Sequence, residues 1–191
     1  PVQNIGAYGL ELQDRFESLD AVDLVTGRSV TLHPRICAFG YRDSTFKRDP
    51  GRWIVTTVEF VLSRSAALRL DYAGVREELA ALGHTDPTHT QVASAVRRLR
   101  RRKLPDPASI GNAGSFFKNP VLANERAAEL KAANPSLPVY PAGERSSKLS
   151  AAWLIEACGW RGFREGDARI SAQHALVLVT HGHPTGAELL C

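Results

Sequence analysis

The order of hydrophobic and polar residues predicts strands in the first third of the chain. Residues 21–25 and 29–32 are alternating apolar segments on either side of Thr26-Gly27-Arg28, which is typical of a β-hairpin. Residues 53–62 form a β-branched and aromatic run, which we expect to be a central strand. Residues 1–64 are therefore predicted to be mainly strands and turns.

Helical patterns dominate further along the chain. Thr88 and Gln91 form a capping box, and the helix that they open should end near Lys103, because Pro105 and Pro107 follow. Its apolar face consists of Val92, Ala95, Val96 and Leu99. We also expect helices at 74–82, 123–133 and 149–158, a proline-rich loop at 135–143 and a strand at 175–180.

Strands and helices are mixed along the chain without regular βαβ alternation, so the pattern favours the α+β class. The best internal boundary is the Leu104–Pro107 segment, which divides the chain into residues 1–104 and 105–191. The chain contains no methionine, opens without a lead-in, and stops soon after a capping box formed by Thr185 and Glu188. We therefore expect it to be part of a longer protein.

Composition is that of a globular protein: 43% of the residues are hydrophobic and 23% are charged. No apolar run is long enough to cross a membrane and no signal peptide is visible, which favours a cytoplasmic location. The net charge of +4 favours anionic partners. Three cysteines without CxxC spacing favour free thiols in a reducing compartment.

Two segments are candidates for a cofactor or substrate site. The glycines in residues 3–9 allow a backbone to approach a flat or anionic ligand, although the segment taken alone favours an ordinary turn. In residues 39–44, Arg42 stands between aromatic and acidic neighbours and has the chemistry to bind a carboxylate through two parallel hydrogen bonds. A structural Arg42–Asp43 pair on a surface turn is the alternative.

The most unusual segment is GNAGSFFKNP, residues 111–120. Two glycines are expected to place Ser115 on a tight turn with Phe116 and Phe117 behind it to exclude water. The segment does not fit a nucleophile elbow, because Phe117 replaces the last glycine. A serine here has the chemistry of a proton donor. The alternative is a glycine-rich loop with both phenylalanines in the core.

Other polar clusters carry weaker signals. Residues 97–103 contain five arginines and Lys103, which permits nucleic-acid binding but also suits the negative end of a helix dipole. No aromatic residues are interleaved, so we expect a mostly solvated face. His181 and His183 lie close together after a strand that His174 precedes, but no third metal ligand is evident.

Five segments together resemble one enzyme family. PVQNIGAYG, FGYRDS, KLPDP, GNAGSFFKNP and KLSAAWLIEACGWRG occur in the order and with about the spacing found in the MurB family of UDP-N-acetylenolpyruvoylglucosamine reductases. The segment around Tyr72 is similar to the type I form of the family. The resemblance covers almost the whole chain.

The resemblance implies an FAD-dependent reductase of bacterial cell-wall synthesis. In this family NADPH reduces the flavin, and a hydride then passes to the enol ether of UDP-N-acetylenolpyruvoylglucosamine to give UDP-N-acetylmuramate. Ser115 matches the serine that protonates the neighbouring carbon, and Arg42 matches the arginine that engages the substrate carboxylate. A positioned cation of this kind stabilises charge that develops during the reaction.

The resemblance also implies ligand contacts. The residues expected to approach the flavin are Gln3, Asn4, Gly6, Ala7, Tyr8 and Tyr41. The residues expected around the diphosphate, uridine or sugar are Tyr72, Arg100, Lys103, Asn119, Tyr140 and Arg161. Residues 1–104 would then be the C-terminal part of the FAD-binding domain, and residues 105–191 a substrate-binding domain lacking its last segment.

The family's N-terminal phosphate-binding region and its catalytic C-terminal glutamate have no counterpart here. We therefore expect the 191-residue chain alone to bind FAD poorly and to have little activity. We expect a monomer without a nucleic-acid or membrane partner. Two alternatives stay open: a basic module that binds nucleotides or nucleic acid through residues 97–103, and another flavoenzyme with a different substrate.

Overall fold

A three-stranded antiparallel sheet organises the N-terminal half of the chain. β3 (Phe16–Asp23) and β4 (Arg28–Leu32) form the predicted hairpin, which is confirmed, and β5 (Trp53–Phe60) pairs with the other side of β3. The order β4-β3-β5 places β3 at the centre, so the expectation of a central strand at 53–62 is wrong. The β-branched content of β5 reflects strand propensity, which does not distinguish an edge from a centre.

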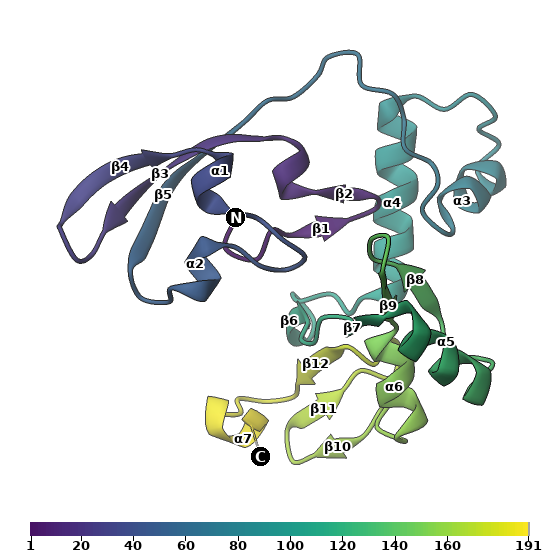
Figure 1. Cartoon of the computed structure of the whole chain (residues 1–191). Helices are drawn as coiled ribbons and strands as arrows, with labels where there is room; N and C mark the ends of the chain where they lie inside the picture. The colour runs from purple at the N-terminus through teal and green to yellow at the C-terminus, as the bar shows by residue number, and fades with distance from the viewer. Residues whose placement is uncertain (191) are drawn as a thin grey trace. The chain divides into compact units, whose positions relative to one another are not determined.

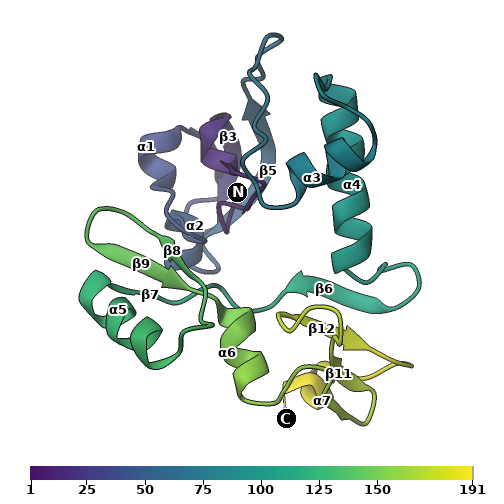
Figure 2. The same cartoon turned by 90° about the vertical axis from the view of Figure 1, so that its right-hand side faces the viewer.

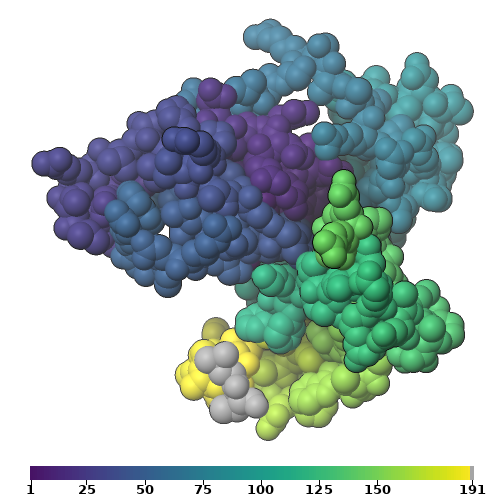
Figure 3. Space-filling view, viewed as in Figure 1, coloured from purple at the N-terminus to yellow at the C-terminus, as the bar shows by residue number. Residues whose placement is uncertain are grey.

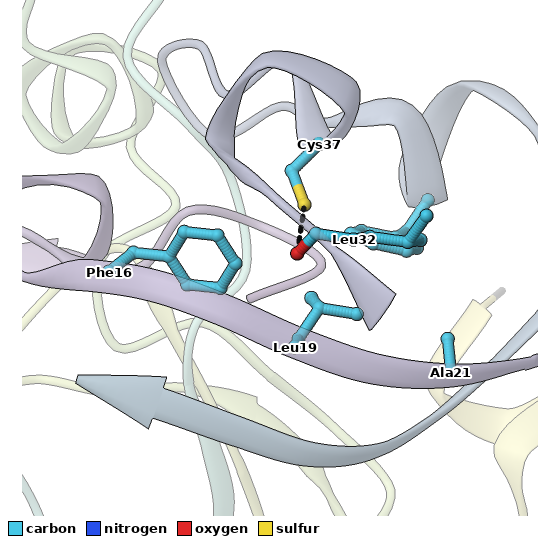
Figure 4. Close-up of a cluster of buried hydrophobic side chains, with 6 residues drawn as sticks. Phe16, Leu19, Ala21, Leu32 and Cys37 are labelled. Atoms are coloured by element: carbon cyan, nitrogen blue, oxygen red, sulfur yellow. Dashed lines mark hydrogen bonds between the residues drawn. The ribbon is translucent and has the colours of Figure 1, made fainter. Parts of the chain in front are cut away.

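One face of this sheet carries the core of the N-terminal half (Figure 4). Phe16, Leu19 and Ala21 of β3 are buried with Leu32. Two short helices, α1 (Pro34–Cys37) and α2 (Thr45–Arg48), add Cys37 and Phe46 to the same cluster. Leu19 and Ala21 are alternate residues and point to the same face, whereas a register shift in the β3–β5 pairing between Phe16 and Ser18 interrupts the alternation before them.

The computed structural model describes residues 1–190 and divides the chain into two units, Pro1–Ala95 and Val96–Cys191 (Figure 1). Unit 1 also contains β1 (Gly6–Ala7), β2 (Leu10–Glu11), a 3-10 turn at Leu12–Asp14 and α3 (Val75–Ala81). The division falls within α4 (His89–Lys103). The assignment of residues 1–104 and 105–191 to a cofactor domain and a substrate domain stays a prediction.

Helix α4 confirms the predicted capping box. The Thr88 N–H donates to the Gln91 side chain at 2.7 Å, and the helix ends at Lys103 as expected. Ala95 and Leu99 on the predicted apolar face are buried, whereas the arginines of residues 97–102 are exposed, as expected for a solvated face.

Unit 2 contains two small antiparallel sheets (Figure 2). One has the order β10-β11-β12-β6 and the other β7-β9-β8. The strands of the first sheet are β6 (Gly111–Ser115), β10 (Arg164–Glu165), β11 (Ala168–Ile170) and β12 (Val177–Thr180). The strands of the second are β7 (Val121–Ala123), β8 (Val139–Pro141) and β9 (Ser146–Leu149). The turn between β8 and β9 projects from the surface of unit 2 (Figure 3).

The helices of unit 2 are close to expectation. They are α5 (Asn124–Ala133), α6 (Ala151–Ala157) and α7 (Gly186–Leu190). The proline-rich segment 135–143 is not all loop, because β8 pairs with β9 there. Pro141 is tolerated because β8 is an edge strand. The mixed content without βαβ alternation confirms the α+β class.

The β3–β4 turn makes the stability of unit 1 depend on pH. Asp23 is buried; its carboxylate accepts a hydrogen bond from the Val25 N–H at 2.9 Å and pairs with Arg52 at 3.2 Å. The Val25 bond, followed by Arg52, holds the pKa of Asp23 below its usual value. A lowered carboxyl pKa contributes stability above the unfolded-state pKa, and this contribution is lost as the pH falls.

We therefore expect Asp23→Asn to flatten the acid limb of the stability profile of unit 1. Urea unfolding measured between neutral pH and about pH 3 should show a smaller loss of stability in this variant than in the wild-type chain. Glu17→Gln, which changes an exposed carboxylate on the same strand, is the matched control. An equally steep acid limb in Asp23→Asn would contradict the assignment.

The core of unit 2 supplies a second test. Leu137 is 1% exposed and packs with Ala127 and Leu149. Leu137→Ala should lower the free energy of unfolding by about 2–4 kcal/mol, because truncation leaves a cavity. Val121→Ala, at a side chain that is 45% exposed, should cost much less in the same urea titration. Equal effects of the two substitutions would show that this cluster is not the core.

Candidate functional site

The turn that carries Arg42 is fixed by a backbone bridge across it and by a hydrogen bond from the residue that follows it. Gly40 and Asp43 form an isolated bridge, and Arg42 has a positive φ of 53°. Ser44 is fully buried, and its hydroxyl donates to the carbonyl of Val2 at 2.6 Å. Asp43 pairs with Arg48 at 2.7 Å, so the alternative of a structural Arg42–Asp43 pair is wrong.

The guanidinium of Arg42 instead binds the glycine-containing N-terminal segment. Nη2 donates to the carbonyl of Gly6 at 2.6 Å, and Nη1 donates to the carbonyl of Asn4 at 3.3 Å. Nη1 also lies 3.5 Å from the carboxylate of Glu11. The side chain is 27% exposed, and its Cζ lies 5.2 Å from the centre of the Tyr41 ring. The two segments singled out in the sequence therefore form one structure.

Gly6 is required by this contact. A Cβ added at this position would lie 2.8 Å from the Glu11 side chain and 2.9 Å from Arg42 Nη1. Any larger residue would displace the carboxylate or the guanidinium. The ordinary-turn interpretation of the glycine segment therefore misses the close approach of an arginine.

Asn4 has a mainly structural role. It is fully buried, and its amide nitrogen donates to Glu11 and to the carbonyl of Gly40, both at 2.9 Å. Its amide oxygen accepts from the Gln13 N–H at 3.0 Å. Both amide hydrogens are thus used, so the side chain has no donor left for a flavin. Of the other predicted flavin contacts, Gln3 and Ala7 are exposed.

Tyr8 and Tyr72 are brought together although they are far apart in sequence. Their ring centres are 4.6 Å apart, in a tilted arrangement. Arg69 ties the Tyr72 segment to this region, because its guanidinium donates to the carbonyl of Gly9 and lies 3.7 Å from Asp14. Both tyrosines line a hollow of about 440 Å³. Nothing in the local pattern around Arg69 pointed to this contact.

A second hollow of unit 1 is almost entirely apolar. It has a volume of about 460 Å³ and is lined in part by Ile5, Gly6, Ala7, Phe60 and Leu62. Ile5 and Leu62 are strongly exposed. An exposed apolar hollow beside a glycine-containing segment suits the face of a flat aromatic ring.

Ser115 of unit 2 lies at the end of a bulged strand. It pairs with Val177, whereas Asn112 pairs with Val179, so β6 carries one extra residue in this stretch. Gly114, with φ 77°, accommodates the bulge. The prediction of a tight turn is wrong, because strand pairing with β12 holds these residues extended. Bulges of this kind re-aim a neighbouring side chain.

The two aromatic residues after Ser115 are not in a core. Phe116 and Phe117 are 58% and 56% exposed, with ring centres 5.0 Å apart. The expectations that they shield the serine from behind or fill the core are therefore both wrong. They line an apolar hollow of about 550 Å³ together with residues of α6 and β12.

The remaining predicted substrate residues are distributed over unit 2. Asn119 accepts a hydrogen bond from the Ala151 N–H at 3.0 Å, at the start of α6. Arg161 donates to the carbonyl of Ala172 at 2.8 Å and pairs with Glu156 at 3.2 Å. Tyr140 lies on β8 beside a hollow of about 400 Å³. Arg100 and Lys103 are exposed in the last turn of α4.

His174 is a neighbour of two of these cations. Burial lowers the pKa of His174, and the positive charges of Lys103 and Arg161 lower it further, against an opposing effect of Glu156. The ring nitrogen Nδ1 faces the Leu176 N–H at 3.3 Å. Sequence reasoning placed His174 before the strand but did not connect it with Lys103 and Arg161, because that connection is made only by the fold.

Comparisons with known proteins identify the class first. Residues 106–191 match the family model described as the C-terminal domain of UDP-N-acetylenolpyruvoylglucosamine reductase. A crystal structure of the reductase MurB from Thermus caldophilus has a similar fold, with a TM-score of 0.59 and 25% identity. The match covers 99% of this chain and 51% of that chain.

Sequence relatives specify the family along the whole chain. The UDP-N-acetylenolpyruvoylglucosamine reductase of Xylella fastidiosa strain 9a5c is 54% identical over 99% of this chain. That of Xanthomonas euvesicatoria is 55% identical over 100% of this chain. The chain is related to these reductases along its whole length, and residues 106–191 belong to the family of their C-terminal domains. The chain spans about half the length of these relatives, 54% and 55% respectively.

Two further kinds of feature are absent from residues 1–190. Within these residues no helix has the length and apolar character needed to cross a membrane. Nor does the described part of the chain gather three histidine, cysteine, aspartate or glutamate residues in a way that would hold a metal ion.

The interaction between Lys103 and His174 can be tested directly. We expect Lys103→Met to raise the pKa of His174 toward its ordinary value, because a neighbouring positive charge disfavours the protonated ring. NMR titration of the His174 ring measures this pKa. Lys118→Met, which changes an exposed lysine elsewhere in unit 2, should leave it unchanged. An unmoved His174 pKa in Lys103→Met would show that the two groups do not interact.

Proposed function

We propose that this chain is part of a flavin-dependent reductase of peptidoglycan precursor synthesis. The substrate is UDP-N-acetylenolpyruvoylglucosamine, the cofactors are FAD and NADPH, and the product is UDP-N-acetylmuramate. The observation that carries the proposal is an identity of 54–55% with reductases of this name along the full length of the chain. The proposed location is the cytoplasm.

The two reacting side chains have the chemistry that this reaction requires. Reduction of the enol ether adds a hydride to one carbon of the double bond and a proton to the other. Reduced FAD, when bound, supplies the hydride. The hydroxyl of Ser115 donates the proton to the second carbon, and Arg42 binds the carboxylate next to the double bond. The carboxylate then carries part of the charge that develops before the proton arrives.

The residues present fit a flavin in part. The hollow beside Ile5, Gly6 and Ala7 is apolar and open, as the face of an isoalloxazine ring requires. Backbone groups of Gly6, Ala7 and Tyr8 would hold the ring, because the side chain of Asn4 is fully engaged inside unit 1. Tyr41 packs against Arg42 and orients it.

The residues proposed for the nucleotide part of the substrate are chemically suited to anions. Arg100, Lys103 and Arg161 are cations at or near the surface of unit 2, and Lys103 and Arg161 share His174 as a neighbour. They are proposed for the diphosphate. Asn119 and Tyr140 are proposed for the sugar and uridine, and Tyr72 of unit 1 for the same ligand. The relatives favour this assignment over a basic nucleic-acid-binding module.

A chimera tests the proposal. This chain would replace the matching 191 residues of the Xylella fastidiosa reductase. We expect NADPH oxidation that depends on UDP-N-acetylenolpyruvoylglucosamine. Ser115→Ala should lower kcat by about 10²–10⁴-fold, because it removes a general acid. Arg42→Lys should lower kcat/KM by about 10²-fold, because lysine cannot form two parallel bonds to a carboxylate.

Flavin absorbance and unfolding temperature of each variant show whether it is folded and loaded. Ser65→Ala, at an exposed serine of unit 1, is the matched control and should keep full activity. A folded, flavin-loaded chimera without substrate-dependent oxidation would refute the proposed activity. Full activity of Ser115→Ala would refute the role of the serine alone.

A further inference from the structure

The carboxylate of Glu11 lies where three side chains converge. One oxygen, Oε2, accepts from the Asn4 amide and from the Gln13 amide, both at 2.9 Å. The other, Oε1, lies 3.5 Å from Nη1 of Arg42. Glu11 stands opposite Gly6 in the β1–β2 pairing, and the missing Cβ of Gly6 leaves the space for this contact.

The contacts of Arg42 leave a defined pair of donors. A guanidinium has five N–H groups. The two at Nη1 face the carbonyl of Asn4 and the carboxylate of Glu11, and one at Nη2 faces the carbonyl of Gly6. Among residues 1–190, the Nε–H donates no hydrogen bond and Nη2 donates only this one. Nε and Nη2 lie on one edge of the guanidinium, and such an edge binds a carboxylate side-on.

We infer that Glu11 is a positioning residue for Arg42, which presents this edge to the carboxylate of the ligand. The inference rests on the proposed function, in which Arg42 binds that carboxylate. Glu11 also reduces the net positive charge of the site, so its contribution is orientation rather than attraction. A group held in the productive geometry raises the rate of the chemical step more than it strengthens binding.

Glu11→Gln tests the orientation of Arg42 with little change of packing, because the amide has nearly the same shape as the carboxylate. A glutamine has one acceptor oxygen and one donor nitrogen. If its oxygen receives Asn4 and Gln13, its NH₂ faces Nη1 of Arg42, and two donors meet. Nη1 then keeps only the carbonyl of Asn4, and Nη2 that of Gly6, so the guanidinium is held less firmly, while the fold of the β1–β2 hairpin is kept.

The first experiment is NMR on the 191-residue chain. A guanidinium held at both terminal nitrogens rotates slowly and gives separate Nη signals. We expect slow exchange between the Nη signals of Arg42 in the wild-type chain and in Glu17→Gln, and faster exchange in Glu11→Gln, where Nη1 keeps only the carbonyl of Asn4 at 3.3 Å. Glu17 is an exposed carboxylate of the same unit, which makes it the matched control. An unchanged exchange rate between the Arg42 signals in Glu11→Gln would overturn the inference, whatever the enzyme activity is.

The second experiment uses the chimera with the Xylella fastidiosa sequence. Glu11→Gln should lower kcat by about tenfold without raising KM for the substrate, because orientation is lost while a repelling charge is removed. In the Arg42→Lys background the same change should have little further effect. A role in folding alone would instead lower the unfolding temperature and act equally in both backgrounds, which would overturn the inference. An inactive wild-type chimera refutes the proposed function, whereas the NMR result remains decisive for Glu11.

Discussion

The structure of unit 1 depends on how the buried polar groups around Arg42 are satisfied. Asn4 is fully buried and Arg42 is largely covered, so each donor and acceptor left without a partner would cost stability. Carbonyls of the N-terminal segment and the Glu11 carboxylate provide partners for the two terminal nitrogens of Arg42. The same contacts join residues 4–11 to the turn at 40–43. The stability of this region and the proposed binding of a carboxylate by Arg42 therefore depend on one network.

Unit 2 positions its groups by strand pairing instead. The bulge between β6 and β12 determines where Ser115 lies, and the turn before β12 determines where His174 lies. Arg161 is tied to the carbonyl of Ala172 and to Glu156, which keeps a cation near the surface without burying it. Each group is thus held by contacts within its own unit, Ser115 in unit 2 and Arg42 in unit 1.

The sequence predicted a structural element correctly where the interaction that forms the element joins residues close together in the chain. The capping box at Thr88 involves residues three apart, and the β3–β4 hairpin involves a short turn. Helices α3, α4, α5 and α6 lie close to the ranges expected from the sequence, and prolines follow the ends of α4 and α5. The position of β5 in the sheet was wrong, since an edge strand and a central strand contain the same kinds of residue.

The sequence by itself determined the α+β class, most of the elements and, through five ordered segments, a resemblance to one family of reductases. It also indicated Arg42 and Ser115 as candidates, because each lies in a segment that contains glycine and has a distinctive polar side chain. Only the tertiary structure decided that Arg42 pairs with Glu11 rather than with its neighbour Asp43, and that Ser115 ends a bulged strand. The physical reason is that these contacts join residues distant in sequence, so no local spacing records them.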